Sequence, residues 1–236
     1  MRILAVGAHP DDIEFMCAGT LAKYKDKGHI IGIAIATNGE VGSSILSKEE
    51  IASIRKKEAE LSASIIGAEF YWLGYPDEFL FNNEEVRLKF IDLVRSFKPD
   101  IIICPSPEHD YHPDHQLTGR IIWEIHVMVT VPNIKTDHPP CEKIPAIVYM
   151  DTVSGVNFLP DRYVDITEYI DIKKRMLECH KSQEDWMKYM YGVTPAEFME
   201  IQARFRGFQC GARYAEGFEI PGLWPRSVNK DNLINF

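Results

Sequence analysis

The chain has 236 residues, of which 45% are hydrophobic and 26% charged, a composition that can bury a full core in an α/β domain. Acidic residues outnumber basic ones by 35 to 26, and the net charge of −9 argues against nucleic acid or an anionic membrane as the main partner. The five cysteines lack C-x-x-C spacing and no apolar run could span a bilayer, so we expect a reduced, cytoplasmic protein without a membrane span.

The first half of the chain alternates β-rich runs with helical patterns, which predicts a parallel sheet covered by helices on both faces. Strands are expected at 2–7, 30–37, 69–73 and 100–104, and helices at 19–27, 47–66, 83–97 and 114–129. The second strand is apolar at nearly every position, as in a strand buried on both faces. Ser47 and Glu50 have the spacing of a capping box, and Gly67 marks the end of that helix.

The second half begins with a surface excursion, since 130–145 contains four prolines and a polar cluster. Further strands are expected at 146–150 and 163–166, a helix capped by Thr167 that runs to 183, a helix from 194 to 208 with a capping box, and a short strand after 213. The predicted fold is a Rossmann-like three-layer α/β/α domain over 1–236 with a mostly parallel twisted sheet. Residues 130–236 would form loop excursions and helices around the site.

Two similar tetrapeptides follow predicted strands. The first motif, His-Pro-Asp-Asp at 9–12, follows the first strand, and the second motif, His-Pro-Asp-His at 112–115, follows the loop after the fourth. The carboxyl ends of parallel strands meet at one edge of a sheet, where ligands bind at the point of strand-order reversal. We therefore expect both motifs to meet there, together with Asn38 and Asp77 from the second and third strand ends.

The two motifs offer the ligands of a catalytic metal. Zinc in such sites takes three protein ligands and keeps one position for water, and two imidazoles with one carboxylate are a common set. His9 and Asp12 can point at one ion while Asp11 points elsewhere, and either His112 or His115 can complete the set. This combination indicates metal-assisted hydrolysis.

Groups in the two motifs that do not bind the metal can also take part in such a reaction. A free carboxylate beside the ion can move protons, and a spare imidazole can stabilise an oxyanion. Asp114 can orient a histidine through the second ring nitrogen of that histidine.

With these motifs the sequence resembles the LmbE-like or PIG-L-type zinc-dependent N-deacetylases. The resemblance rests on the segments 8–12 with Glu14, Arg55 with Glu58, 74–77, 112–115 and 165–183. It implies a hydrolase that removes acetyl from an N-acetylglucosamine-type sugar or glycoconjugate and releases acetate and a free amine. It also implies a homo-oligomer, a trimer or a hexamer.

The family likeness assigns a role to each motif residue. It implies His9, Asp12 and His115 as ligands of Zn²⁺, with Fe²⁺ or another divalent metal as the alternative. Asp11 corresponds to the general base and His112 to the histidine that stabilises the oxyanion.

The likeness also names residues for the sugar, and it contains one departure. Arg55 and Asp77 are expected to contact the substrate. Some relatives carry a mobile tyrosine two residues before the position of His112; here that residue is Asp110, and Tyr111 is adjacent to it.

Several alternatives stay open. Asp11 could merely cap a helix, Arg55 lies in a charged run typical of a solvated helix face, and Asp77 follows a proline in a turn-like segment. Two histidines and a carboxylate also form the triad of non-haem iron enzymes. A metal-binding sugar-binding protein without catalysis is another alternative. A nucleotide-binding protein is disfavoured because the G-x-G-x-x-G pattern is absent.

Overall fold

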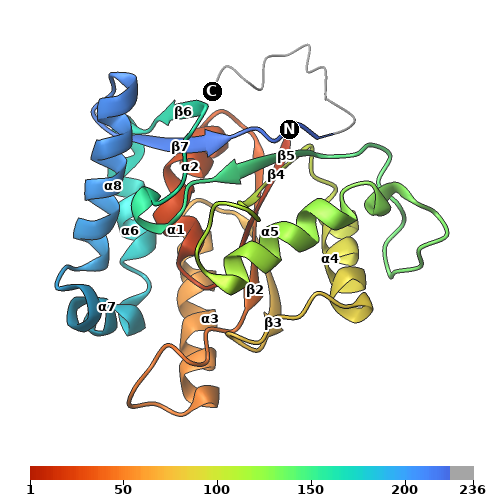
Figure 1. The fold of residues 1–236 in the computed structure, drawn as a ribbon, viewed down its shortest axis with the longest axis horizontal. Coiled ribbons are helices and arrows are strands. Elements are labelled where there is room, and N and C mark those ends of the chain that lie inside the picture. The colour runs from red at the N-terminus through yellow and green to blue at the C-terminus, as the bar shows by residue number, and fades with distance from the viewer. Residues whose placement is uncertain (224–236) are drawn as a thin grey trace.

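The structure is a computed structural model that describes residues 1–223, apart from the side chains of residues 185, 190 and 191. A sheet with strand order β3-β2-β1-β4-β5-β7-β6 forms its middle layer (Figure 1). The strands are β1 Arg2–Gly7, β2 Ile30–Thr37, β3 Glu69–Tyr75, β4 Ile101–Pro105, β5 Ala146–Met150, β6 Arg162–Asp165 and β7 Ala215–Glu219. The first five strands run parallel to one another, whereas β7 runs antiparallel to both β5 and β6. The predicted mostly parallel sheet is confirmed.

Strand β1 lies at the point where strand order reverses. It pairs with β2 on one side and with β4 on the other, so that Ala5 is in register with both Ile33 and Ile103. The segments that leave the carboxyl ends of β1 and β4 carry the two motifs. The topology therefore places them next to each other, where open α/β sheets bind ligands.

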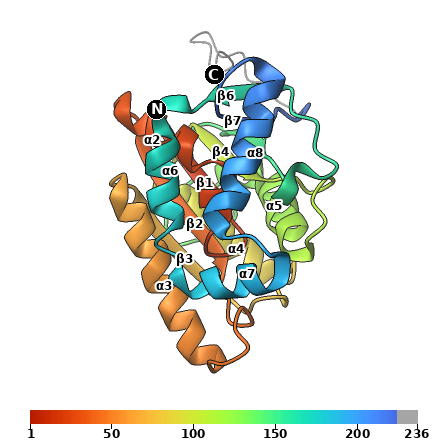
Figure 2. The same cartoon turned by 90° about the vertical axis from the view of Figure 1, so that its left-hand side faces the viewer.

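Helices cover both faces of the sheet, as Figures 1 and 2 show. Ile3 and Ala5 point into one core, and Leu4 and Val6 point into the other, because successive side chains of a strand face opposite sides. The first core is closed by α1 Asp12–Met16, α2 Ala18–Asp26, α3 Lys48–Ile65, α6 Ile170–Leu177 and α8 Pro195–Cys210. The second is closed by α4 Glu84–Phe97 and α5 Pro113–Ile125. Helix α7 Glu184–Tyr191 contacts α8.

The predicted capping signals hold in the structure. Ser47 accepts a hydrogen bond from the Glu50 amide at the start of α3, and the Glu50 carboxylate returns to Ser47. Thr194 and Glu197 form the same reciprocal pair at the start of α8. These bonds satisfy amide groups that a helix leaves unpaired at its amino end.

The predicted helix from Thr167 to 183 is wrong. Thr167 opens a short 3₁₀ turn, η3 Thr167–Tyr169, and α6 ends at Leu177. His180 then leaves helical geometry (φ −83°, ψ 55°) and buries its ring beside the carboxylate of Glu14. The turn η4 Lys181–Gln183 and the unpredicted helix α7 follow. A buried polar contact thus interrupts a segment with helical spacing.

One other predicted boundary was wrong, and one helix was not predicted. The helix expected to reach 129 ends at Ile125 and is followed by the 3₁₀ turn η1 Met128–Thr130. The buried guanidinium of Arg95 takes the carbonyl oxygens of Val129, Val131 and Ile134, which therefore leave helical bonding. The short helix α1, before the predicted helix at 19–27, was not expected. No helix within residues 1–223 is long and apolar enough to cross a bilayer.

Candidate active site

A cavity of about 290 Å³ lies where the segments after β1, β2, β3 and β4 meet, with α7 and α8 closing it. Both motifs reach it, and so do Arg55 from α3 and Asp77 from the segment after β3. The predicted convergence of the two motifs and Asp77 is therefore what the structure shows, whereas Asn38, also expected there, does not line the cavity. The full lining is His9, Asp11, Asp12, Phe15, Val41, Gly42, Arg55, Asp77, Glu78, Tyr111, His112, His115, Val153, Gln183, Trp186, Met187 and Phe198.

A buried His/Asp/His group occupies the base of this cavity. His9 Nδ1 lies 3.1 Å from His115 Nε2 and 3.7 Å from Asp12 Oδ2, and His115 Nε2 lies 3.2 Å from Asp12 Oδ1. All three residues are less than a tenth exposed. Donor atoms bonded at 2.0–2.1 Å to a tetrahedral zinc ion lie roughly 3.3 Å from one another. The spacing and the nitrogen-oxygen donor set therefore fit such an ion.

Asp12 is held in place by the backbone of its own motif. Its Oδ2 accepts hydrogen bonds from the amides of Ala8 and His9, both at 2.8 Å. Burial alone would raise the pKa of Asp12, but the charge of His115 and hydrogen bonds to both histidines hold it well below its ordinary value. The carboxylate therefore stays ionised, with Oδ1 directed at His115.

Asp110 orients His115, a role that the sequence reasoning missed. Its Oδ2 lies 2.9 Å from His115 Nδ1, and its Oδ1 accepts a hydrogen bond from the His112 amide at 3.0 Å. The signal available in the sequence was an aspartate two residues before the second motif. A carboxylate on the second ring nitrogen fixes the tautomer and the direction of a ligating histidine.

His9 is oriented by Asp77 and Asp114 in a similar way. Its Nε2 lies 3.0 Å from Asp77 Oδ1 and 3.4 Å from Asp114 Oδ2. Asp114 Oδ2 also accepts a hydrogen bond from the Glu78 amide at 2.8 Å, so that it ties the segment after β3 to the start of α5. Burial works against the charged form of His9, yet bonds to Asp114, Asp12 and Asp77 raise its pKa well above the ordinary value.

Asp11 adopts an unusual backbone. It is the N-cap residue of α1 with φ 111°, in the left-handed region, and its side chain makes no capping hydrogen bond. The carboxylate instead lines the cavity, with Oδ2 3.3 Å from Arg55 Nη2. Burial raises the pKa of Asp11 to about 6, although Arg55 opposes this shift. A merely capping role is therefore wrong, and strain of this kind is typical of functional sites.

Arg55 is a buried residue rather than part of a solvated helix face. Its side chain is 5% exposed. Nη2 donates to the Pro10 carbonyl oxygen at 2.6 Å, and Nη1 donates to the Gly39 carbonyl oxygen at 3.2 Å. The guanidinium thus connects the first motif to the segment after β2.

The ring of His112 packs against both other histidines of the cavity, with centroids 4.6 Å from His9 and 4.8 Å from His115. Its Nδ1 accepts a hydrogen bond from the Asp114 amide at 3.3 Å, which leaves Nε2 as the donor, 3.2 Å from Glu78 Oε1. Burial and the charges of His9 and His115 lower its pKa. Ring nitrogens of His9, His112 and His115 lie within 4.8 Å of one another. His112 can therefore act on a group held beside an ion.

A further polar cluster lies beneath Asp11. Glu14 accepts a hydrogen bond from Ser62, and its Oε1 lies 3.3 Å from His180 Nε2 without hydrogen-bond geometry. Burial opposes both charges, but each partner favours the charge of the other, so the pKa of Glu14 is lowered and that of His180 is raised. This buried pair connects α1, which carries Glu14, to the segment after α6, which carries His180.

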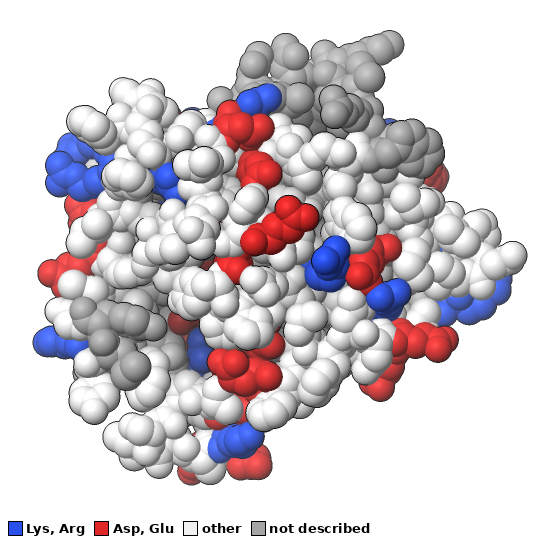
Figure 3. Space-filling model, in the orientation of Figure 1, with Lys and Arg blue, Asp and Glu red and all other residues white. Residues whose placement is uncertain are grey.

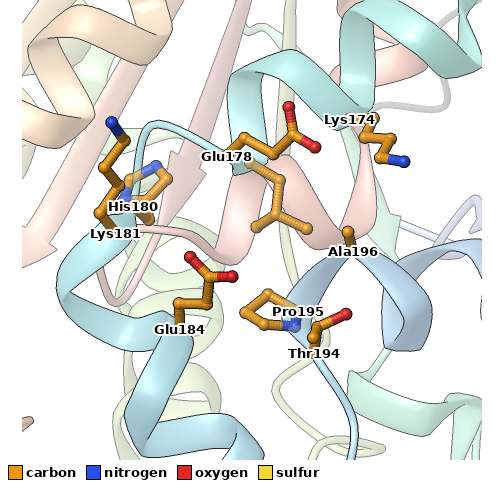
Figure 4. A pocket seen from close by; sticks show the side chains of 9 residues that line it. Lys174, Glu178, His180, Lys181, Glu184, Thr194, Pro195 and Ala196 are labelled. Carbon is orange, nitrogen blue, oxygen red and sulfur yellow. The ribbon is translucent and has the colours of Figure 1, made fainter.

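A second cavity, of about 260 Å³, lies between α6, α7 and the start of α8 (Figure 4). Its lining includes His180 but no residue of either motif. Two lysines and two glutamates give it no preference for one sign of charge. We therefore place the candidate active site at the first cavity.

Comparison with known proteins agrees with this assignment. The PIG-L family, described as GlcNAc-PI de-N-acetylase, matches residues 4–126, which include both motifs. Diacetylchitobiose deacetylase of Thermococcus kodakarensis is 28% identical over 94% of this chain and 84% of its own length. A probable N-acetyl-alpha-D-glucosaminyl L-malate deacetylase 2 of Bacillus cereus is 30% identical over 79% of this chain and 85% of its own.

The fold is shared with a solved deacetylase as well. The N,N'-diacetylchitobiose deacetylase from Pyrococcus horikoshii, complexed with its inhibitor, superposes with a TM-score of 0.81 at 32% identity. The match covers 93% of this chain and 83% of that one. The chain belongs to the PIG-L (LmbE-like) family, and the relatives described above are named as deacetylases.

Proposed function

We propose that the protein is a metal-dependent N-deacetylase that acts on an N-acetylglucosamine-type sugar or glycoconjugate. The observation that carries the proposal is the buried group of His9, Asp12 and His115, with the unligated carboxylate of Asp11 in the same cavity. The names of the relatives, which refer to diacetylchitobiose and to a glucosaminyl malate, support this substrate class.

In the proposed site His9 Nδ1, Asp12 Oδ1 and His115 Nε2 hold the metal. We propose zinc, with iron(II) as the alternative, because a nitrogen-oxygen donor set at this spacing suits either. A bound zinc ion supplies Lewis acidity and a water molecule whose pKa is lowered to about 7. The three ligands are in turn fixed by Asp77, Asp110, Asp114 and the amides of the first motif.

The remaining residues move protons and stabilise charge. Asp11 accepts a proton from the attacking water and then delivers it to the departing amine, since it faces the cavity and is not a ligand. The Nε2 proton of His112 donates a hydrogen bond to the acetyl oxygen as negative charge develops there. Arg55 keeps the Asp11 carboxylate in position through Nη2.

The contacts of Arg55 and Asp77 with the sugar stay predictions. Both residues line the cavity, which supports such contacts, and both also bind protein groups. The trimer or hexamer and the cytoplasmic location likewise stay predictions from the sequence and the family likeness.

The variant Asp11→Asn tests the assignment of the base. It should keep its metal, measured by elemental analysis, and lose acetate release by roughly 10²–10⁴-fold, the usual contribution of a general base. Asp171→Asn, at an exposed position of α6, is the matched control and should keep full activity. Turnover at the wild-type rate in Asp11→Asn would reject the role of Asp11.

The rivals predict different products. A binding protein without catalysis would bind the sugar and release no acetate. A non-haem iron enzyme would consume oxygen with the sugar, and a chelator would stop that consumption. Acetate and oxygen measured in the same reaction separate the three functions.

A further inference from the structure

The cavity that we assign to catalysis has an acidic lining. Four carboxylates face it, those of Asp11, Asp12, Asp77 and Glu78, whereas Arg55 is the one arginine or lysine among its described residues. A divalent cation would still leave the lining net negative with neutral histidines. On the face shown in Figure 3 the described Lys and Arg side chains are scattered among Asp and Glu and form no continuous basic patch.

Arg55 is not available to a charged substituent of the substrate. Its side chain is 5% exposed, and its two terminal nitrogens already donate to Pro10, Gly39 and Asp11. Its Nε has no hydrogen-bond partner but is buried. Lys48, at the start of α3, is directed to Glu40 at 3.3 Å and does not line the cavity. A carboxylate or phosphate is normally recognised by a free guanidinium or ammonium group. The described lining offers none.

The lining also has an apolar part, which comes from other elements. Phe15 belongs to α1, Val153 to the 3₁₀ turn η2 Val153–Gly155, Trp186 and Met187 to α7, and Phe198 to α8. The rings of Phe15 and Phe198 pack edge to face at 5.8 Å. In Figure 1, α7 and α8 form one side of the molecule, away from α4 and the body of α5. Apolar and aromatic walls of this kind bind flat apolar surfaces.

We infer that this site selects substrates by the group attached to the N-acetylated sugar. An uncharged group with a flat apolar face, a second pyranose or an aryl ring, is accepted against the wall of α7 and α8. A group that carries a carboxylate or a phosphate is disfavoured by the acidic lining. The inference rests on the proposed function and concerns which member of that substrate class is used.

A matched substrate panel tests the inference. Acetate release would be measured with methyl N-acetylglucosaminide, an aryl N-acetylglucosaminide, N,N'-diacetylchitobiose, N-acetylglucosaminyl malate and N-acetylglucosamine 1-phosphate. We expect kcat/KM for the aryl glycoside and the disaccharide to be at least tenfold above that for the two anionic sugars. The difference should narrow as salt is added, because screening weakens repulsion. Comparison of kcat/KM for the aryl glycoside and the disaccharide shows whether an aryl ring or a second pyranose is preferred.

Variants of Trp186 and Glu78 test the apolar part and the acidic part of the lining separately. Trp186→Ala should lower the ratio of kcat/KM for the disaccharide to that for the methyl glycoside at least fivefold, and Trp186→Phe should restore most of it. Tyr189→Ala, on the same helix but 83% exposed, is the control and should leave this ratio unchanged. Glu78→Gln should raise the anionic-to-neutral ratio severalfold. Metal content would confirm that each variant is folded.

The outcomes distinguish the inference from the proposed function. Equal or higher kcat/KM for the malate or phosphate sugar would overturn the inference and leave the deacetylase assignment intact. An unchanged ratio in both Trp186→Ala and Glu78→Gln would do the same. Absence of acetate release from every substrate, with metal bound, would overturn the proposed function and the inference with it.

Discussion

Asp110 shows how a single buried carboxylate can control a metal site from outside the cavity. It is 4% exposed, does not line the cavity, and contacts both the ring of His115 and the amide of His112. Its two oxygens therefore fix the direction of one proposed ligand and the backbone of His112, the histidine that we propose for the oxyanion. Carboxylates in this position are energetically coupled to the metal although they never touch it.

Removal of the Asp110 carboxylate should therefore weaken metal binding. Asp110→Ala should lower zinc affinity by roughly 10–100-fold, measured by competition with a chromogenic chelator, and excess zinc should recover part of the activity. Glu108→Gln, an exposed neighbour in the same loop, is the control and should bind zinc like the wild type. An unaltered affinity in Asp110→Ala would show that His115 needs no such support.

The sequence predicted which residues form the candidate site better than it predicted where their side chains point. The two motifs offered His9, Asp12 and either His112 or His115, and the family likeness implied His115. The structure brings His9, Asp12 and His115 together. The sequence did not reveal that Asp110 holds His115, because the direction of that carboxylate depends on the path of the loop after β4. Nor did it reveal the burial of Arg55, whose charged neighbours resemble a solvated helix face.

A buried ion pair joins several elements on one side of the sheet. Lys173 of α6 binds Glu216 of β7 and donates to the Phe15 carbonyl oxygen of α1 at 2.8 Å. Glu216 accepts hydrogen bonds from the amides of Gly19 and Thr20 at the start of α2. Both charged side chains are nearly inaccessible, so each depends on the other for compensation.

Loss of one partner should be strongly destabilising. Lys173→Met leaves Glu216 buried without its cation and should lower the free energy of unfolding by about 3–5 kcal/mol, measured by urea denaturation. Lys174→Met, at the adjacent exposed position, should change it by less than about 0.5 kcal/mol. If the two variants unfold at the same urea concentration, the ion pair does not hold these elements together.

Elements with local signals were predictable, and elements shaped by distant contacts were not. The capping boxes located the starts of α3 and α8 because the two members of each box are only three residues apart. The end of α6 and the start of α7 depend on the contact of His180 with Glu14, which is remote in sequence. Periodicity alone could not show that break.

At the scale of the whole molecule, the metal would connect the two halves of the parallel sheet. Its proposed ligands lie after β1 and within α5, which follows β4. The alternation of strands and helices predicted this arrangement. It did not predict that β7 would insert antiparallel between β5 and β6, since strand order at an edge is set by tertiary pairing.

A metal that joins two segments should stabilise the fold. A ligand present at 100 times its dissociation constant adds about 2.7 kcal/mol, which corresponds to a Tm shift of roughly 5–10 °C for a chain of this size. Chelation should lower Tm by that amount, and added zinc should restore it. The variant His115→Ala should respond little to chelator, whereas an equal response would place the metal elsewhere.

At Asp11, the left-handed backbone conformation should lower stability while the carboxylate serves the proposed activity. A non-glycine residue in a sparsely populated conformation costs about 1–3 kcal/mol, and glycine would relieve that strain while removing the carboxylate. Because we propose Asp11 as the base, we expect that selection for heat resistance alone would favour glycine at this position at the expense of activity. Stabilising substitutions in this protein should therefore be sought at positions other than Asp11.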